Sequence, residues 1–241
     1  TNEERRMKVI EFGIHKSKAE NGFDPDRWFE GRYIVPYDKG GESDTDSGWL
    51  PNYYVPTNYF IDWSTWALNR MRTLSIGQRD GTNRETIAAV FRNIGYYYLE
   101  GITFSITGIY APTFRVNNIG VFDVKGSFIE PPFNLHSVIG VLASKLNKML
   151  SKVYIYNCVD MQVDAIKEIP FYVKEDERIE GLVRQIINNQ EKNLRYVYSS
   201  NEQKEIDQIV YGLYGLNSED IKEVETWYAR RYPKLARLCD I

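Results

Sequence analysis

Apolar and aromatic positions are arranged differently in the two halves of the chain. From about residue 28 to residue 130 they gather in short runs of β-forming residues that Gly, Pro and Asn interrupt. These runs are NYYVPTNYFIDW (52–63), GYYYLEGITFSITG (95–108), YAPTFRV (110–116) and VFDVKGSFI (121–129). The pattern predicts a twisted, largely antiparallel sheet. Apolar positions at near-helical spacing predict a helix over 63–74 between the strands.

The remaining apolar positions follow helical spacing. In PPFNLHSVIGVLASKLNKML (131–150) they recur at i, i+3, i+4 and i+7, which predicts a helix with Asn134 as its cap. The stretch 153–170 predicts a strand and a turn, and acidic helices follow to the end of the chain. Three are expected, around 179–187, around 206–213 with a stop at Gly215, and around 221–227. A short lead-in helix is expected within 1–20.

Together these patterns predict an α+β fold, with a mixed, largely antiparallel β-sheet domain, inserted helices and a C-terminal helical segment. We divide the chain into a lead-in helix and linker (1–27), an α+β domain (28–175) and the helical segment (176–241).

Composition narrows the class of protein. A chain of 241 residues with 43% hydrophobic content can bury a substantial core. Cys158 and Cys239 are the two cysteines, far apart in sequence, so neither a disulfide framework nor a zinc site is expected, and a reducing cytoplasm fits. No run of eighteen apolar residues occurs, so no membrane association is expected. The N-terminus lacks Met and a signal peptide, which favours a piece of a longer protein.

Two local motifs carry candidate chemistry. DKGG (38–41) has too few glycines and no Gly-Lys-Ser/Thr ending, so a nucleotide-binding loop is rejected in favour of a turn. Asp123 and Lys125 could belong to a metal-dependent nuclease, but that chemistry needs further carboxylates around the metal. Alternating charges on a strand face are the commoner explanation of that pair.

A local excess of arginine is the most informative charge pattern. The formal net charge is −3, so binding to nucleic acid would need local positive patches. Within 61–98 such a patch is formed by Arg70, Arg72, Arg79, Arg84 and Arg92, beside the run Tyr96-Tyr97-Tyr98. Arginine engages phosphates by charge and guanine edges by its forked donors, so the patch suits duplex DNA. A solvated helix face with ion pairs is an equally good interpretation of this observation alone.

Several segments, in this order, resemble one family. They are RYIVPYDKGGESDTDSGWLPNYYVPTNYFIDW, GITFSITGIYAPTFRV, VFDVKGSFI and VIGVLASKLNKML…VDMQVDAIKEIPF, with DQIVYGLYGLNSEDIKEVE later in the chain. Together they resemble the target-recognition region of single-chain adenine methyltransferases and type IIG restriction-modification enzymes, including BREX phage-defence methyltransferases. The helix reads Leu142-Ala143-Ser144-Lys145 where that family often has Asn before Ser-Lys.

The resemblance implies a role in binding double-stranded DNA. It implies that Lys39, Gly40 and Gly41 form a recognition element whose glycines let the backbone approach a phosphate. The same resemblance marks Ser105, Thr107, Arg115 and Lys125 as DNA-facing candidates, with core or turn roles still open. The parent protein would transfer a methyl group from S-adenosylmethionine to the exocyclic amine of a flipped adenine. Its catalytic methyltransferase portion is absent here, since no cofactor glycine loop or Asn-Pro-Pro-aromatic motif occurs, and Glu130 precedes Pro131-Pro132.

Two other functions stay open at this point. One is a stand-alone metal-dependent nuclease that uses Asp123 and Lys125. The other is a protein-interaction scaffold whose acidic C-terminal helices bind partner subunits. The recognised DNA sequence, the oligomeric state and any nuclease activity of the parent do not follow from the sequence.

Overall fold

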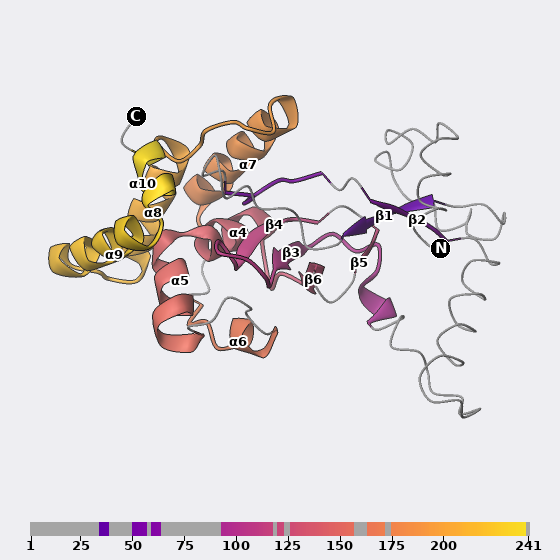
Figure 1. Cartoon of the computed structure of the whole chain (residues 1–241), viewed down its shortest axis with the longest axis horizontal. Helices are drawn as coiled ribbons and strands as arrows, with labels where there is room; N and C mark the ends of the chain where they lie inside the picture. The colour runs from indigo at the N-terminus through magenta and orange to yellow at the C-terminus, as the bar shows by residue number, and fades with distance from the viewer. Residues whose placement is uncertain are drawn as a thin grey trace. The chain divides into compact units, whose positions relative to one another are not determined.

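The computed structural model describes residues 34–38, 50–56, 59–63, 93–117, 120–122, 126–156, 163–171 and 175–239. The lead-in helix expected within 1–20 and almost all of the helix expected over 63–74 lie outside these residues. The described elements run in the order β1 (Ile34–Asp38), β2 (Phe60–Asp62), η2 (Ile94–Tyr96), β3 (Ile102–Ser105), β4 (Thr113–Val116), β5 (Val121–Phe122), β6 (Gly126–Ile129), α4 (Leu135–Ala143), α5 (Lys145–Leu150), η3 (Ser151–Ile155), α6 (Val163–Lys167), α7 (Glu177–Lys192), α8 (Glu202–Leu213), α9 (Ser218–Arg231) and α10 (Pro233–Cys239). The fold is α+β, with helices filling the C-terminal part (Figure 1).

The chain forms two compact units, and each is built from segments that are far apart in sequence. The first consists of Thr1–Lys39, Pro56–Glu100 and Asn118–Val124, and the second of Gly40–Val55, Gly101–Asn117 and Lys125–Ile241. The predicted division at residues 27 and 175 stays a prediction. Within the α+β fold, the described strands form one three-stranded sheet in each unit.

The first unit contains a mixed sheet in the order β2-β1-β5. β1 pairs with β2 antiparallel, with Val35 opposite Ile61, and with β5 parallel. Among the described residues of this unit, Val35, Trp63, Tyr97 and Val121 form a buried hydrophobic cluster. The rings of Trp63 and Tyr97 meet edge-on with their centroids 5.8 Å apart. Aromatic side chains therefore supply part of the apolar surface that the described residues of this unit bury.

The second unit contains an antiparallel sheet in the order β4-β3-β6, with Phe104 opposite Phe114. Tyr53 lies beside β4, because its N–H donates to Phe114 O and its carbonyl accepts from Val116 N, each at 2.8 Å. The β3–β4 hairpin is also tied at its base. Gly101 N donates to Asn117 Oδ1 at 2.9 Å, and Asn117 N donates to Gly101 O at 3.0 Å.

The helix predicted over 131–150 is present but broken. Asn134 caps α4 as predicted, since its side chain accepts from His136 N and Ser137 N. At Ser144 the backbone turns to an extended conformation, and the Ser144 side chain accepts from Asn147 N to cap α5. The strand predicted in 153–170 is wrong for the described residues: Tyr156 N donates to Ser151 O and closes a π-turn, and α6 follows.

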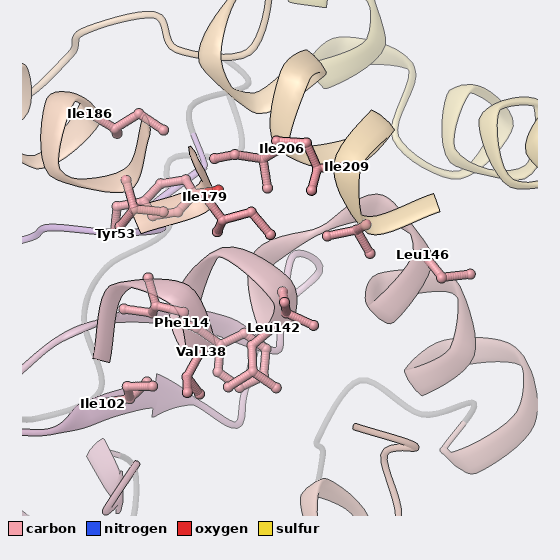
Figure 2. Close-up of a cluster of buried hydrophobic side chains, with 14 of the residues drawn as sticks. Tyr53, Ile102, Phe114, Val138, Leu142, Leu146, Ile179, Ile186, Ile206 and Ile209 are labelled. Carbon is pink, nitrogen blue, oxygen red and sulfur yellow. The ribbon is translucent and has the colours of Figure 1, made fainter. Parts of the chain in front are cut away.

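One hydrophobic core joins the second sheet to the C-terminal helices. Figure 2 shows side chains from the strands, from α4 and from α7 and α8 gathered in a single cluster. Ile102 and Phe114 come from the sheet, Val138 and Leu142 from α4, and Ile179 and Ile206 from the helices beyond residue 175. The predicted C-terminal helical segment is consequently part of the same folding unit as the sheet. Burial of these side chains contributes about 1.5–3 kcal/mol for each one.

The C-terminal helices begin and end at residues whose local chemistry explains the boundary. α8 stops at Gly215 as predicted: φ is +70° there, Gly215 N donates to Gly212 O, and Leu216 N donates to Tyr211 O. α9 begins with a capping box between Asn217 and Asp220. Within the described part of the chain, no helix is both long enough and apolar enough to cross a bilayer.

Candidate nucleic-acid interface

Most of the predicted DNA-binding residues lie outside the described part of the chain. These are Lys39, Gly40, Gly41, Arg70, Arg72, Arg79, Arg84 and Lys125, and they stay predictions. Asp123, the carboxylate of the nuclease alternative, lies outside it as well. The structure does place Ser105, Thr107 and Arg115, all on or next to the β3–β4 hairpin.

Arg115 and Ser105 are turned toward each other and buried. Arg115 is 1% exposed and Ser105 is 8% exposed. Arg115 Nη1 donates to Ser105 Oγ at 2.9 Å. In the ladder, Arg115 stands opposite Thr103, and Ser105 stands opposite Thr113, so these four polar residues share one face of the hairpin. In this structure Arg115 and Ser105 therefore support the hairpin from within, and the core role left open for Ser105 is the one that the geometry favours.

Thr107 has the opposite placement. It is exposed in the β3–β4 loop, and Ile109 beside it is 54% exposed. Gly108 between them has a φ of +122°, a conformation that favours glycine, and the loop closes when Ala111 N donates to Gly108 O at 3.1 Å. An exposed tip on a closed loop can present a hydroxyl donor and acceptor to a ligand.

A buried lysine fixes the far side of this loop. The ammonium group of Lys148, in α5, donates to the carbonyl oxygens of Tyr110 and Pro112. Burial lowers the pKa of Lys148 well below its usual value, and the nearby charge of Lys152 lowers it further. The two carbonyl acceptors replace water around the ammonium group, so α5 holds the backbone of the loop in place.

Aromatic packing fixes the same loop to the end of the chain. Tyr110 packs with Tyr228, Tyr232 and Leu235 in a small buried cluster. The rings of Tyr110 and Tyr232 have centroids 5.9 Å apart, and those of Tyr228 and Tyr232 are 5.2 Å apart. The β3–β4 loop is thus connected by direct packing to α9 and α10.

A buried polar network joins α5, α8 and α9. Lys145 Nζ donates to Glu225 Oε2 at 2.7 Å and lies 3.9 Å from Asp207 Oδ2. Asp207 Oδ1 accepts from Lys145 N at 2.9 Å and from Gln203 Nε2 at 3.1 Å. Burial raises the pKa of Asp207 to about 7, and the positive charge of Lys145 opposes that rise. Tyr211 donates to Glu225 Oε1 at 2.7 Å, and burial raises its pKa far above the usual value.

This network was not predicted from the sequence, although one feature of α8 indicates it. Asp207 directly follows Ile206 within the apolar stripe of α8, where a carboxylate is unexpected unless a partner is buried with it. Lys145 also belongs to the Ser-Lys helix on which the resemblance rests. We interpret the network as structural, because Asp207 and Lys145 lie inside the unit at 1% and 8% exposure.

Within the described residues, no three His, Cys, Asp or Glu side chains gather closely enough to hold a metal ion. Searches with the sequence gave no further guide to this interface. No protein-family model matches the chain, and no curated protein matches it.

Proposed function

We propose that this chain is the DNA target-recognition portion of a larger adenine-specific DNA methyltransferase or restriction-modification enzyme. The proposal rests first on the order of the segments that resemble that family. According to this proposal, the chain recognises and binds a specific DNA site, while methyl transfer belongs to another portion of the parent protein.

One structural observation carries the proposal further. Three of the resembling segments, ITFS (102–105), TFRV (113–116) and GSFI (126–129), pair as one antiparallel sheet. The resembling helix, here α4 and α5, packs against β4 and against the C-terminal helices. These three segments and the helix therefore belong to the second unit, whereas β1, β2 and β5, which also lie in resembling segments, belong to the first.

Within the proposal, the β3–β4 loop reads the DNA. Binding residues are commonly carried on loops that a rigid scaffold positions. Thr107 is the predicted contact that the described structure leaves exposed, and Lys148 and Tyr110 hold its loop. Arg115 and Ser105 act indirectly, by keeping the two strands of the hairpin in register.

S-adenosylmethionine would supply the methyl group in the parent protein. The sequence offers no glycine-rich loop after a strand that fits this cofactor. We therefore assign no step of the transfer to the residues of this chain.

The proposal is tested by selection of binding sites from a pool of random duplexes at two salt concentrations. We expect the wild-type chain to enrich a short motif and to bind less tightly as salt rises, because phosphate contacts release counterions. Lys39→Ala and Thr107→Ala should weaken that binding, and Lys204→Ala, an exposed change on α8, should not. Absence of any enriched motif would overturn the proposal, and salt-insensitive capture of a protein partner without DNA binding would favour the scaffold alternative.

A further inference from the structure

The last two helices carry a dense group of exposed cations that the acidic composition of the C-terminal region conceals. Arg230, Arg231, Lys234 and Arg237 are all exposed, and we name residues 230–237 the basic segment. No Asp or Glu occurs between residues 226 and 239. The four acids of α9, Glu219, Asp220, Glu223 and Glu225, all precede residue 226, and Glu225 is paired with Lys145. The end of the chain is therefore locally positive, although the helices were predicted to be acidic throughout.

Local helix stability accounts for this charge only in part. A cation near a helix C-terminus interacts favourably with the helix dipole, which suits Arg230 and Arg231 in the last turn of α9 and Arg237 in the last turn of α10. Lys234, however, lies in the first turn of α10, the end at which the dipole disfavours a cation. Among the described residues, none forms an ion pair with Arg230 or Arg237. The helix dipoles thus favour three of the four cations, and Lys234 adds a positive charge that they disfavour.

The basic segment is held firmly, since its apolar residues are buried. Tyr228, Tyr232 and Leu235 recur at i, i+4 and i+7 and are 8%, 1% and 4% exposed. The guanidinium carbon of Arg231 lies 5.9 Å from the centroid of the Tyr232 ring. Buried side chains at this spacing leave the cations of the intervening positions on the outside.

The same packing places the basic segment next to the loop that carries Thr107. Tyr232 contacts Tyr110, and Tyr110 belongs to the β3–β4 loop. The loop and the basic segment both belong to the second unit. They lie close together because their buried aromatic side chains pack against each other. The exposed cations of the basic segment are therefore carried on a backbone that packs against this loop.

We infer that the basic segment binds the sugar-phosphate backbone of duplex DNA beside the β3–β4 loop, through contacts that do not depend on base sequence. This inference rests on the proposed function and adds a contact surface to it. Arginine and lysine are the side chains that position a protein on DNA through phosphates. A protein partner would instead call for exposed aromatic or aliphatic anchors, and the large apolar side chains of this segment are buried.

The test measures the affinity of the full 241-residue chain for a duplex of random sequence over a series of salt concentrations. The variant Arg230→Gln/Arg237→Gln removes two exposed charges, and Lys192→Gln/Lys204→Gln removes two exposed charges from α7 and α8 as the matched control. Each lost phosphate contact should reduce the slope of log affinity against log salt by about 0.9. We expect the slope of Arg230→Gln/Arg237→Gln to fall by nearly twice this amount, and its affinity at low salt to fall about tenfold. The control should keep the wild-type slope. Thermal unfolding followed by circular dichroism confirms that both variants are folded.

The outcomes separate this inference from the proposed function. An unchanged slope in Arg230→Gln/Arg237→Gln overturns the inference, even if a motif is enriched in the selection described above. A reduced slope without any enriched motif supports the inference and overturns sequence-specific recognition. If the wild-type chain binds no duplex at low salt, both fail. Binding to poly-glutamate without binding to duplex would then assign the basic segment to an acidic protein.

Discussion

The guanidinium group of Arg115 donates to the hydroxyl of Ser105 across neighbouring strands, at 2.9 Å and out of contact with solvent. The two residues are diagonal neighbours in the β3–β4 ladder, because Arg115 pairs with Thr103 and Ser105 pairs with Thr113. A charged group buried at this position stabilises the hairpin only while its partners stay in place. The relationship gives a way to separate residues that support the β3–β4 loop from residues that contact DNA in the proposed function.

Arg115→Ala should destabilise the chain, whereas Thr107→Ala should not. Removing the buried guanidinium leaves a cavity and unpaired polar groups, which we expect to cost about 2–4 kcal/mol. Thr107 is exposed, so its loss should change the unfolding free energy by less than about 0.5 kcal/mol. Urea denaturation of both variants measures the difference. Equal stability of Arg115→Ala and wild type would contradict the supporting role.

Gly140→Ala should lower stability although alanine is the better helix former. A Cβ at Gly140 would lie 2.3 Å from Ile179 Cγ2 and 3.1 Å from Val183 Cγ2, both inside the contact between α4 and α7. Overpacking of this kind costs about 1–3 kcal/mol, which exceeds the gain of about 1 kcal/mol from helix propensity. Gly181 in α7 provides the control, since a Cβ there would meet nothing within 4 Å. Gly181→Ala should raise the melting temperature, whereas Gly140→Ala should lower it.

Asp207→Asn should remove a pH-dependent loss of stability. The folded chain raises the pKa of Asp207 from 3.8 to about 7, so between these values the folded state binds a proton that the unfolded state releases. The unfolding free energy of the wild type should therefore fall, relative to the variant, as pH rises from about 4 to about 7. The full pKa change corresponds to about 4 kcal/mol.

Chemical denaturation of wild type and Asp207→Asn at pH 5 and pH 8 checks this expectation. The variant should gain stability relative to the wild type between pH 5 and pH 8, because the two pH units from 5 to the folded pKa of about 7 correspond to about 3 kcal/mol. A difference between them that does not change with pH would mean that Asp207 is ionised throughout this range in the folded chain.

Lys148→Ala should loosen the β3–β4 loop. The change leaves the carbonyls of Tyr110 and Pro112 without their donor and opens space beneath the loop. We expect a loss of about 2–4 kcal/mol in stability and faster amide hydrogen exchange in residues 106–112. The exposed Lys204→Ala change should leave both quantities as in wild type. Retained protection of the loop in Lys148→Ala would show that the aromatic cluster alone holds it.

Local sequence rules predicted the helices where the controlling residues are close together. Asn134 caps α4 and Gly215 ends α8, because both signals act within one helical turn. The break at Ser144 was missed, since the apolar spacing continues across it from Leu142 to Leu146. The β-forming residues after Ser151 wrongly predicted a strand, where a π-turn and α6 are found instead.

The candidate site was harder to predict than the fold. The sequence indicated that Ser105 and Arg115 stand in strands, but an alternating pattern does not reveal that the polar face is buried together with the apolar one. The basic segment was missed for another reason. Counting charge over whole helices combines the four acids of α9 with the cations that follow them, although these acids all precede residue 226 and the cations of the basic segment begin at residue 230. Predicting the segment required knowing that Tyr232 and Leu235 point inward.

Reciprocal hydrogen bonds join Gly101 and Asn117 at the base of the β3–β4 hairpin. They hold the two ends of the β3–β4 hairpin together, and the hydrogen bond from Arg115 to Ser105 joins its two strands. The tip can therefore change in length or composition while its stems keep the same separation, since lengthening a closed loop adds little entropy loss. Residues 106–109 can therefore be replaced, in evolution or by design, while the two strands of the hairpin keep their pairing.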